Sequence, residues 1–120
     1  MSLCVLAGGK TVVMAVSAFT LAWTHSVEKT GWEEDWRATP AGLHLVEARV
    51  QGSGAGMEPP EGAQLADGWW RWKPALPPQQ RLVLAASGAT VSGWSLCGGG
   101  TCIALGNAAG EPVVIAPCGE

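Results

Sequence analysis

The heptapeptide at residues 18–24, AFTLAWT, alternates large apolar side chains with small or hydroxyl-bearing ones. Successive side chains of a β-strand point to opposite faces of its sheet. Phe19, Leu21 and Trp23 would therefore share one face, and the residues between them the other. A period of two is typical of a strand that is buried on one side. This stretch predicts a half-buried β-strand.

Similar segments recur along the 120-residue chain. Short runs rich in Val, Leu, Thr and Trp are separated by turns drawn from 17 glycines and 8 prolines. Such spacing is typical of an all-β sandwich or barrel. We expect strands at Leu3–Ala7, Thr11–Val16, Ala18–Val27, Trp32–Thr39, Leu43–Gln51, Gly68–Lys73, Leu82–Ala86, Val91–Cys97, Cys102–Leu105 and Val113–Ala116.

No long window keeps a helical period without Gly or Pro, and the best helical candidate, Glu33–Ala38, would form one turn at most. The sequence therefore predicts one all-β domain over residues 1–120. Its architecture should be a small antiparallel β-sandwich or a partly open barrel of short strands.

Composition excludes several classes of function. The chain is 48% apolar and 14% charged, which argues against disorder. The seven Lys and Arg residues are scattered and the net charge is −3, so we expect no nucleic-acid binding. The apolar stretch Thr11–Thr24 is shorter than the roughly 20 residues of a membrane-spanning helix, so no transmembrane segment is expected. Met1–Gly9 lacks the basic residues of a secretory signal.

The four cysteines suggest two disulfides. Cys97 and Cys102 flank a glycine-rich loop, and residues facing each other across a hairpin can lie about 4.5 Å apart at Cα, a distance that a disulfide tolerates. Cys4 and Cys118 lie on the first and last expected strands, so a second bridge would join the ends if those strands are neighbours. The alternatives are four free thiols or a zinc site, although no Cys-x-x-Cys pair is present. Paired cysteines would favour an oxidising compartment.

Polar residues concentrate between Trp23 and Trp36, where one His, four acidic residues and three Trp share 14 positions. A hairpin around Lys29–Gly31 would bring His25 and Glu28 near Glu33 or Glu34. One imidazole and two carboxylates can hold a metal ion, and His25, Glu28 and Glu34 are the candidate ligands. The alternative is a histidine that is hydrogen-bonded for purely structural reasons.

Catalysis is not expected, and neither is a cofactor. His25 and Ser26 are neighbours on an expected strand, so their side chains point apart and cannot form a dyad. The chain has no Gly-x-Ser-x-Gly turn to present a nucleophile. The glycine-rich run Gly52–Met57 lacks the Lys of a phosphate-binding loop, which favours a tight turn.

The seven tryptophans, beside one Phe and no Tyr, suit either a compact core or a platform on which a ligand stacks. In the expected strand Gly68–Lys73, alternation directs Trp70 and Trp72 to one face and Trp69 to the other.

Three segments resemble the signature of a bacterial family catalogued as domain of unknown function 1850. They are Thr24–Glu28 (THSVE), the pair Glu33–Glu34, and Gly54–Met57 (GAGM). The Leu-rich strand Leu43–Arg49 and the positions of Cys97 and Cys102 are similar as well. The resemblance covers most of the chain.

The resemblance implies an accessory role. Members of the family are often encoded beside tripartite (TRAP) transporters of the TAXI type, which import small organic acids. We therefore expect a non-enzymatic accessory or interaction domain at the bacterial cell envelope, with transporter subunits as partners and a periplasmic or envelope location. The alternatives are a small-ligand or metal-binding module and, more remotely, a hydrolase. The resemblance also groups the candidate ligand-binding residues on one surface: His25, Ser26, Glu28, Glu33, Glu34, Gly54, Gly56 and Met57.

Overall fold

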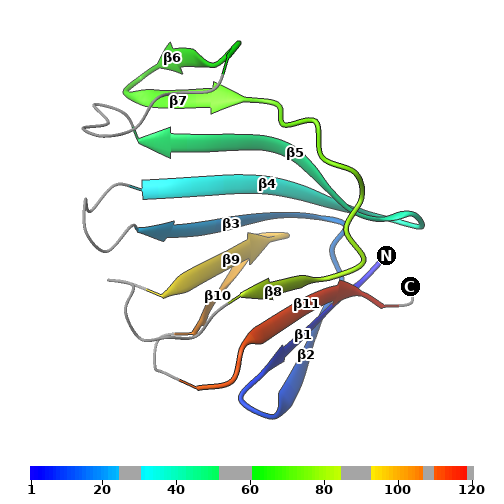
Figure 1. Ribbon diagram of the computed structural model, residues 1–120. Coiled ribbons are helices and arrows are strands. Elements are labelled where there is room, and N and C mark those ends of the chain that lie inside the picture. The colour runs from blue at the N-terminus through cyan, green and yellow to red at the C-terminus, as the bar shows by residue number, and fades with distance from the viewer. Residues whose placement is uncertain (25–30, 52–60, 85–92, 107–109, 119–120) are drawn as a thin grey trace.

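The computed structural model describes residues 1–24, 31–51, 61–84, 93–106 and 110–118. These residues form eleven strands and no helix, arranged as two antiparallel sheets that pack against each other (Figure 1). The predicted all-β class and the sandwich architecture are confirmed. The described strands do not close into a barrel.

The large sheet has seven strands. In their spatial order they are β10 (Thr101–Leu105), β9 (Trp94–Gly98), β3 (Ala18–Thr24), β4 (Gly31–Thr39), β5 (Gly42–Gln51), β7 (Trp69–Trp72) and β6 (Gln64–Ala66). β6 was not among the expected strands. Glu33–Ala38, the best helical candidate, is part of β4. A single helical turn leaves most of its backbone N–H and C=O groups without partners, whereas a strand within a sheet pairs them with its neighbours.

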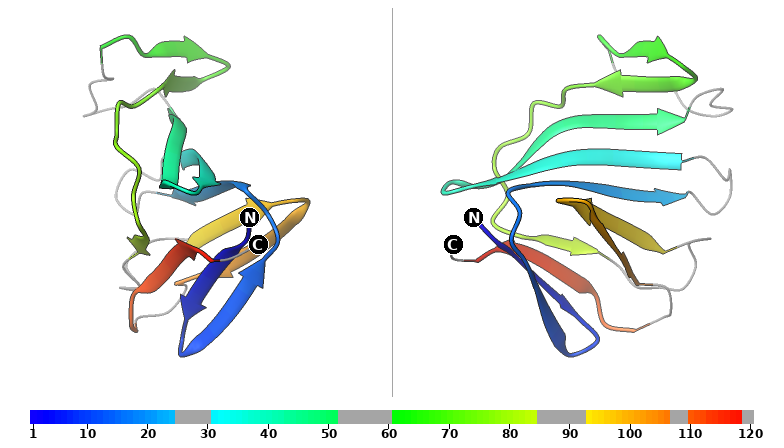
Figure 2. Two further views of the ribbon diagram at one scale, coloured as in Figure 1. Left: turned by 90° about the vertical axis from the view of Figure 1, so that its right-hand side faces the viewer. Right: turned by 180° about the vertical axis from the view of Figure 1, so that it is seen from behind.

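The small sheet has four strands. In spatial order they are β2 (Lys10–Met14), β1 (Leu3–Ala7), β11 (Val113–Pro117) and β8 (Leu82–Leu84). It covers only part of the large sheet, and β7 and β6 project away from it (Figure 2). The first and the last strand, β1 and β11, are paired in the middle of the small sheet (Figure 2).

The core lies between the sheets. Its buried side chains come from both of them: Leu3, Val5, Met14, Phe19, Leu21, Trp36, Ala38, Leu43, Leu84, Leu96, Leu105, Val113 and Ile115. Phe19 and Leu21 belong to the heptapeptide whose alternation predicted a half-buried strand, and both are at most 3% exposed. That prediction is confirmed.

A β-bulge interrupts the β4–β5 pairing. Asp35 lies opposite Glu47, but the next residue, Trp36, lies opposite Leu45, so Val46 has no partner across the ladder. The extra residue shifts the alternation of β5 by one position. Leu45 and Ala48 can therefore both face inward although they are three residues apart.

Both predicted disulfides are present. Cys97 and Cys102 lie directly opposite each other in the β9–β10 hairpin, with their Cα atoms 4.1 Å apart. Cys4 and Cys118 join the paired segments β1 and β11 at a Cα separation of 5.6 Å. All four cysteines are bridged, which excludes both the free-thiol and the zinc alternatives.

Candidate functional site

Most of the predicted ligand-binding surface lies outside the described residues. This is true of His25, Ser26, Glu28, Gly54, Gly56 and Met57. Glu33 and Glu34 are described, and as neighbours on β4 they point to opposite faces of the large sheet. They therefore do not share one surface, and a single ion or small ligand can contact only one of the two. For the six other residues the prediction stays a prediction.

Glu33 belongs to a charge network on the outer face of the large sheet, centred on Arg49. The guanidinium contacts three carboxylates: Nε is 2.9 Å from Glu33 Oε1, Nη1 is 2.7 Å from Asp35 Oδ2, and Nη1 is 2.6 Å from Glu47 Oε2. Residues directly opposite each other share a face, which is why Glu33 and Arg49 meet. We call these four residues the Arg49 network.

The network changes the acidity of Asp35 and of Arg49. Hydrogen bonding to Arg49, aided by a hydrogen bond from Thr20, holds the pKa of Asp35 below its ordinary value. The same carboxylates raise the pKa of Arg49 still further, with the hydrogen bond to Asp35 as the largest cause. The Arg49 side chain is only 12% exposed, whereas those of Glu33 and Asp35 are each 36% exposed. The guanidinium donates hydrogen bonds to all three carboxylates, which suits a structural role.

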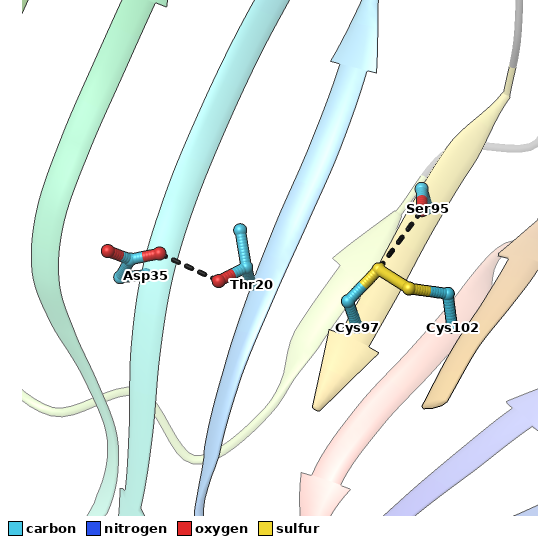
Figure 3. Close-up of a disulfide and its surroundings, with 5 residues drawn as sticks. All are labelled: Thr20, Asp35, Ser95, Cys97 and Cys102. Atoms are coloured by element: carbon cyan, nitrogen blue, oxygen red, sulfur yellow. Dashed lines mark hydrogen bonds between the residues drawn. A yellow bond between two sulfur atoms is a disulfide. The ribbon is translucent and has the colours of Figure 1, made fainter. Parts of the chain in front are cut away.

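The network continues towards the hairpin disulfide. Thr20 Oγ1 donates a hydrogen bond of 2.7 Å to Asp35 Oδ1, and Thr20 lies opposite Cys97 on β9 (Figure 3). Ser95 Oγ lies 3.6 Å from Cys97 Sγ, and because that sulfur is bridged, the hydroxyl is the donor. A depression of about 360 Å³ beside this row is lined by Asp35, Arg37 and Cys97, among others.

The network was missed at the sequence level, although a signal was present. Acidic residues occupy alternate positions, 33 and 35, on one strand, and Glu47 and Arg49 occupy alternate positions on the next. The tight hairpin between β4 and β5 makes these positions neighbours. Only the bulge, which adds one residue to β5, decides that they face each other.

Glu34 lies on the inner face, opposite Leu21 and Ala48. Its Oε1 accepts a hydrogen bond of 3.0 Å from Trp36 Nε1. Burial raises the pKa of this carboxyl, and the hydrogen bond from Trp36 offsets part of that effect. A carboxylate in apolar surroundings is expensive to keep ionised.

Six of the seven tryptophans share this inner face, as the strand registers show: Trp23, Trp32, Trp36, Trp70, Trp72 and Trp94. The rings of Trp23 and Trp32 stack with centroids 5.9 Å apart, and those of Trp23 and Trp94 are 4.7 Å apart and tilted. Trp69 faces outward against Gly31, where an added Cβ would lie 3.0 Å from the indole. The predicted division of Trp69 from Trp70 and Trp72 is confirmed.

The outer face of the small sheet is apolar. Two adjacent rows of side chains cross it, Val13–Cys4–Ala116 and Thr11–Leu6–Val114–Val83. Leu6, Val13 and Val83 are 45%, 62% and 57% exposed. The four strands carry one charged residue, Lys10, at the start of β2. We call Leu6, Val13, Val83 and Val114 the apolar outer face.

Two further observations concern the residues that the structure describes. Among them, no three His, Cys, Asp or Glu side chains are arranged to hold a metal ion. They also include no helix long and apolar enough to cross a membrane.

Comparison with known protein families assigns most of the chain. Residues 19–105, or 87 of the 120, match the family described as Domain of unknown function (DUF1850). The chain therefore belongs to this family, as the resemblance implied. Neither a curated protein nor a solved structure matches it. The matched region runs from β3 to β10 and includes the Arg49 network.

Proposed function

We propose that this chain is a non-enzymatic accessory domain that binds a protein partner through the apolar outer face of its small sheet. The partner that the family resemblance indicates is a subunit of a TAXI-type tripartite transporter at the bacterial cell envelope. The observation that carries the proposal is the exposure of Leu6, Val13 and Val83 on one continuous face.

An antiparallel sheet commonly exposes only one of its faces to water. One face packs on the core and the other is solvated and polar. The large sheet follows this rule, because its outer face carries the Arg49 network. The small sheet departs from it, and contiguous apolar surface of this kind marks interaction sites in proteins. The two disulfides support an oxidising compartment such as the periplasm.

Retention of purified transporter subunits on the immobilised chain tests the proposal. We expect a subunit, soluble or detergent-solubilised, to be retained by the unchanged chain and lost with Leu6→Lys or Val83→Lys. The matched control is Val46→Lys, because Val46 is as exposed as Leu6 (43% against 45%) but lies at the bulge of the large sheet. Failure of every subunit to bind the unchanged chain would refute the accessory role.

A second candidate function is a small-ligand or metal-binding module built on the polar segment between β3 and β4. The observation that favours it is the pairing of Thr24 with Gly31, which brings the two ends of this segment side by side. Since Glu33 and Glu34 face opposite sides of the sheet, one metal ion can use only one of them.

Calorimetric titration with Zn²⁺ or Mn²⁺ tests this second candidate. We expect His25→Ala and Glu34→Gln to weaken metal binding, with Glu33→Gln as the control that leaves the affinity unchanged. Equal affinities in all three variants would exclude the site.

A further inference from the structure

An apolar groove of about 360 Å³ opens beside the apolar outer face. It runs between β2 and the turn that joins β9 to β10, and its side-chain walls include Val12, Val13, Val16 and Ile103. No charged residue lines it. The glycines of the β9–β10 turn let the backbone come close: a Cβ added to Gly99 would lie 2.9 Å from Val16 Cγ1.

β2 borders this groove with an open edge, since among the described strands it pairs only with β1. The two strands are joined by a two-residue turn in which Gly8 and Gly9 have φ angles of 59° and 77°. Positive φ at both positions defines a type I′ hairpin, whose flanking residues Ala7 and Lys10 form a hydrogen-bonded pair.

Hydrogen-bonded and non-hydrogen-bonded pairs alternate along an antiparallel ladder. Counting from the turn, Lys10, Val12 and Met14 bond to β1. Thr11 and Val13 therefore direct their backbone N–H and C=O groups away from β1, towards the open edge.

Proteins usually protect such an edge with charged residues, proline or a bulge, because unpaired backbone groups attract another strand. Between Thr11 and Met14 β2 carries none of these. Val12 and Val13 are 44% and 62% exposed instead. An edge with outward backbone groups and a neutral apolar groove beside it is complementary to an extended segment with apolar side chains.

We propose that β2 accepts an extended, uncharged strand from a partner polypeptide, whose apolar side chains enter the groove. The proposal rests on the accessory role above and specifies how the partner is recognised. A second copy of this chain does not fit as the occupant. Two β2 strands of five residues, paired edge to edge, would bury far less than the approximately 800 Å² per partner of a stable interface.

A synthetic peptide tests this mode of binding directly. The probe is a ten-residue peptide of alternating Val and Thr with Lys at each end, added to the intact oxidised chain. We expect amide hydrogen exchange at Thr11 and Val13 to slow at least about tenfold at saturation, while exchange at Val83 on the opposite edge strand stays unchanged. Absence of binding, or binding without slower exchange at these two amides, overturns the proposal.

Two modifications sharpen the test. Val13→Pro removes an outward N–H that takes no part in the β1–β2 ladder, so an edge strand should tolerate it, and we expect at least about tenfold weaker peptide binding. If this variant does not fold, the unchanged chain is titrated with the same peptide N-methylated at alternate residues, which should not bind. Val46→Thr, at the bulge of the large sheet, is the matched control and should bind as the unchanged chain does. Equal affinity for the methylated peptide overturns the proposal, as does a concentration-dependent dimer that forms without peptide and is lost in Val13→Pro.

The outcomes separate this inference from the proposed function. If transporter subunits bind Val13→Pro and the unchanged chain equally well, strand addition is excluded and the accessory role stands. If no subunit binds the unchanged chain but the peptide slows exchange at Thr11 and Val13, the accessory role is excluded and strand addition stands.

Discussion

The outer face of the large sheet and the outer face of the small sheet differ in the polarity of the side chains that they expose. On the large sheet, Arg49 gathers Glu33, Asp35 and Glu47 at distances of 2.6–2.9 Å. On the small sheet, the outer face has exposed valines and a leucine and no charged side chain, because Lys10 lies opposite Ala7 and alternation directs it to the other face. Each face also carries one disulfide.

This difference indicates that the outer face of the large sheet contributes to stability and that the apolar outer face of the small sheet is suited to binding. The charged side chains on the outer face of the large sheet are hydrogen-bonded to one another and partly exposed to water, so that face needs no partner. Covering the apolar outer face would be favourable by about 25 cal/mol for each Å² of apolar surface removed from water. Substitutions on the large sheet should therefore lower the free energy of unfolding, and substitutions on the apolar outer face should change binding.

The largest expected effect separates the two disulfides. The Cys4–Cys118 bridge spans 114 residues and the Cys97–Cys102 bridge spans 5. By the loop-entropy argument the first should contribute about 5 kcal/mol to the free energy of unfolding and the second about 2 kcal/mol. Urea unfolding of Cys4→Ser/Cys118→Ser and of Cys97→Ser/Cys102→Ser measures both. Equal losses of unfolding free energy in the two double variants would contradict the larger contribution expected of the Cys4–Cys118 bridge.

Removing the centre of the Arg49 network should have the next largest effect. Arg49→Met leaves three carboxylates facing one another without their shared cation, and we expect a loss of about 2 kcal/mol in the free energy of unfolding. Arg71→Met is the control. Its side chain is 45% exposed and has one ion pair of 3.7 Å, so its loss should stay within about 0.5 kcal/mol. Chemical denaturation compares the two, and losses of the same size would show that the network has no special role.

A smaller effect should depend on pH, with opposite sign on the two faces of β4. The pKa of Asp35 is lowered on folding, so its contribution to stability is present above the unfolded pKa and is lost as pH falls through the folded pKa. The pKa of Glu34 is raised on folding, so its contribution is present below the unfolded pKa and is lost as pH rises through the folded pKa.

The matching variants test these signs by denaturation at neutral pH and at a pH below the ordinary carboxyl range of about 4. At neutral pH, Asp35→Asn should destabilise the fold, whereas Glu34→Gln should stabilise it by about 1 kcal/mol, because no charge is then buried beside the tryptophans. In acid both differences should shrink towards zero. The same sign for both variants at neutral pH would contradict the assignment of Glu34 to the inner face.

The smallest effect on stability is expected on the apolar outer face. Leu6→Thr and Val83→Thr should change the free energy of unfolding by no more than about 0.5 kcal/mol, as is usual for exposed positions. The same variants should bind less of a dye that fluoresces on apolar surface. Val46→Thr on the large sheet should leave dye binding unchanged, and a loss as large as that of Val83→Thr would show that the apolar outer face is not the dye's site.

Much of the fold could be predicted from local pattern. Alternation in AFTLAWT identified the inward face of β3, and the two cysteine pairs were placed correctly from their positions on expected strands. β6 was missed because a strand of three residues is too short to show a period. Glu33 and Glu34 were grouped on one surface because they are adjacent in sequence, whereas adjacency in a strand separates side chains.

The sequence by itself determined the all-β class, the inward face of each alternating strand and the cysteine partners, because these depend on spacing along the chain. Only the tertiary structure decided which strands lie side by side, that the bulge at Val46 turns Arg49 towards Glu33 and Asp35, and that the small sheet leaves its outer face and the edge of β2 uncovered. These features depend on register and on the packing of two sheets, and both arise from contacts between residues that are distant in sequence.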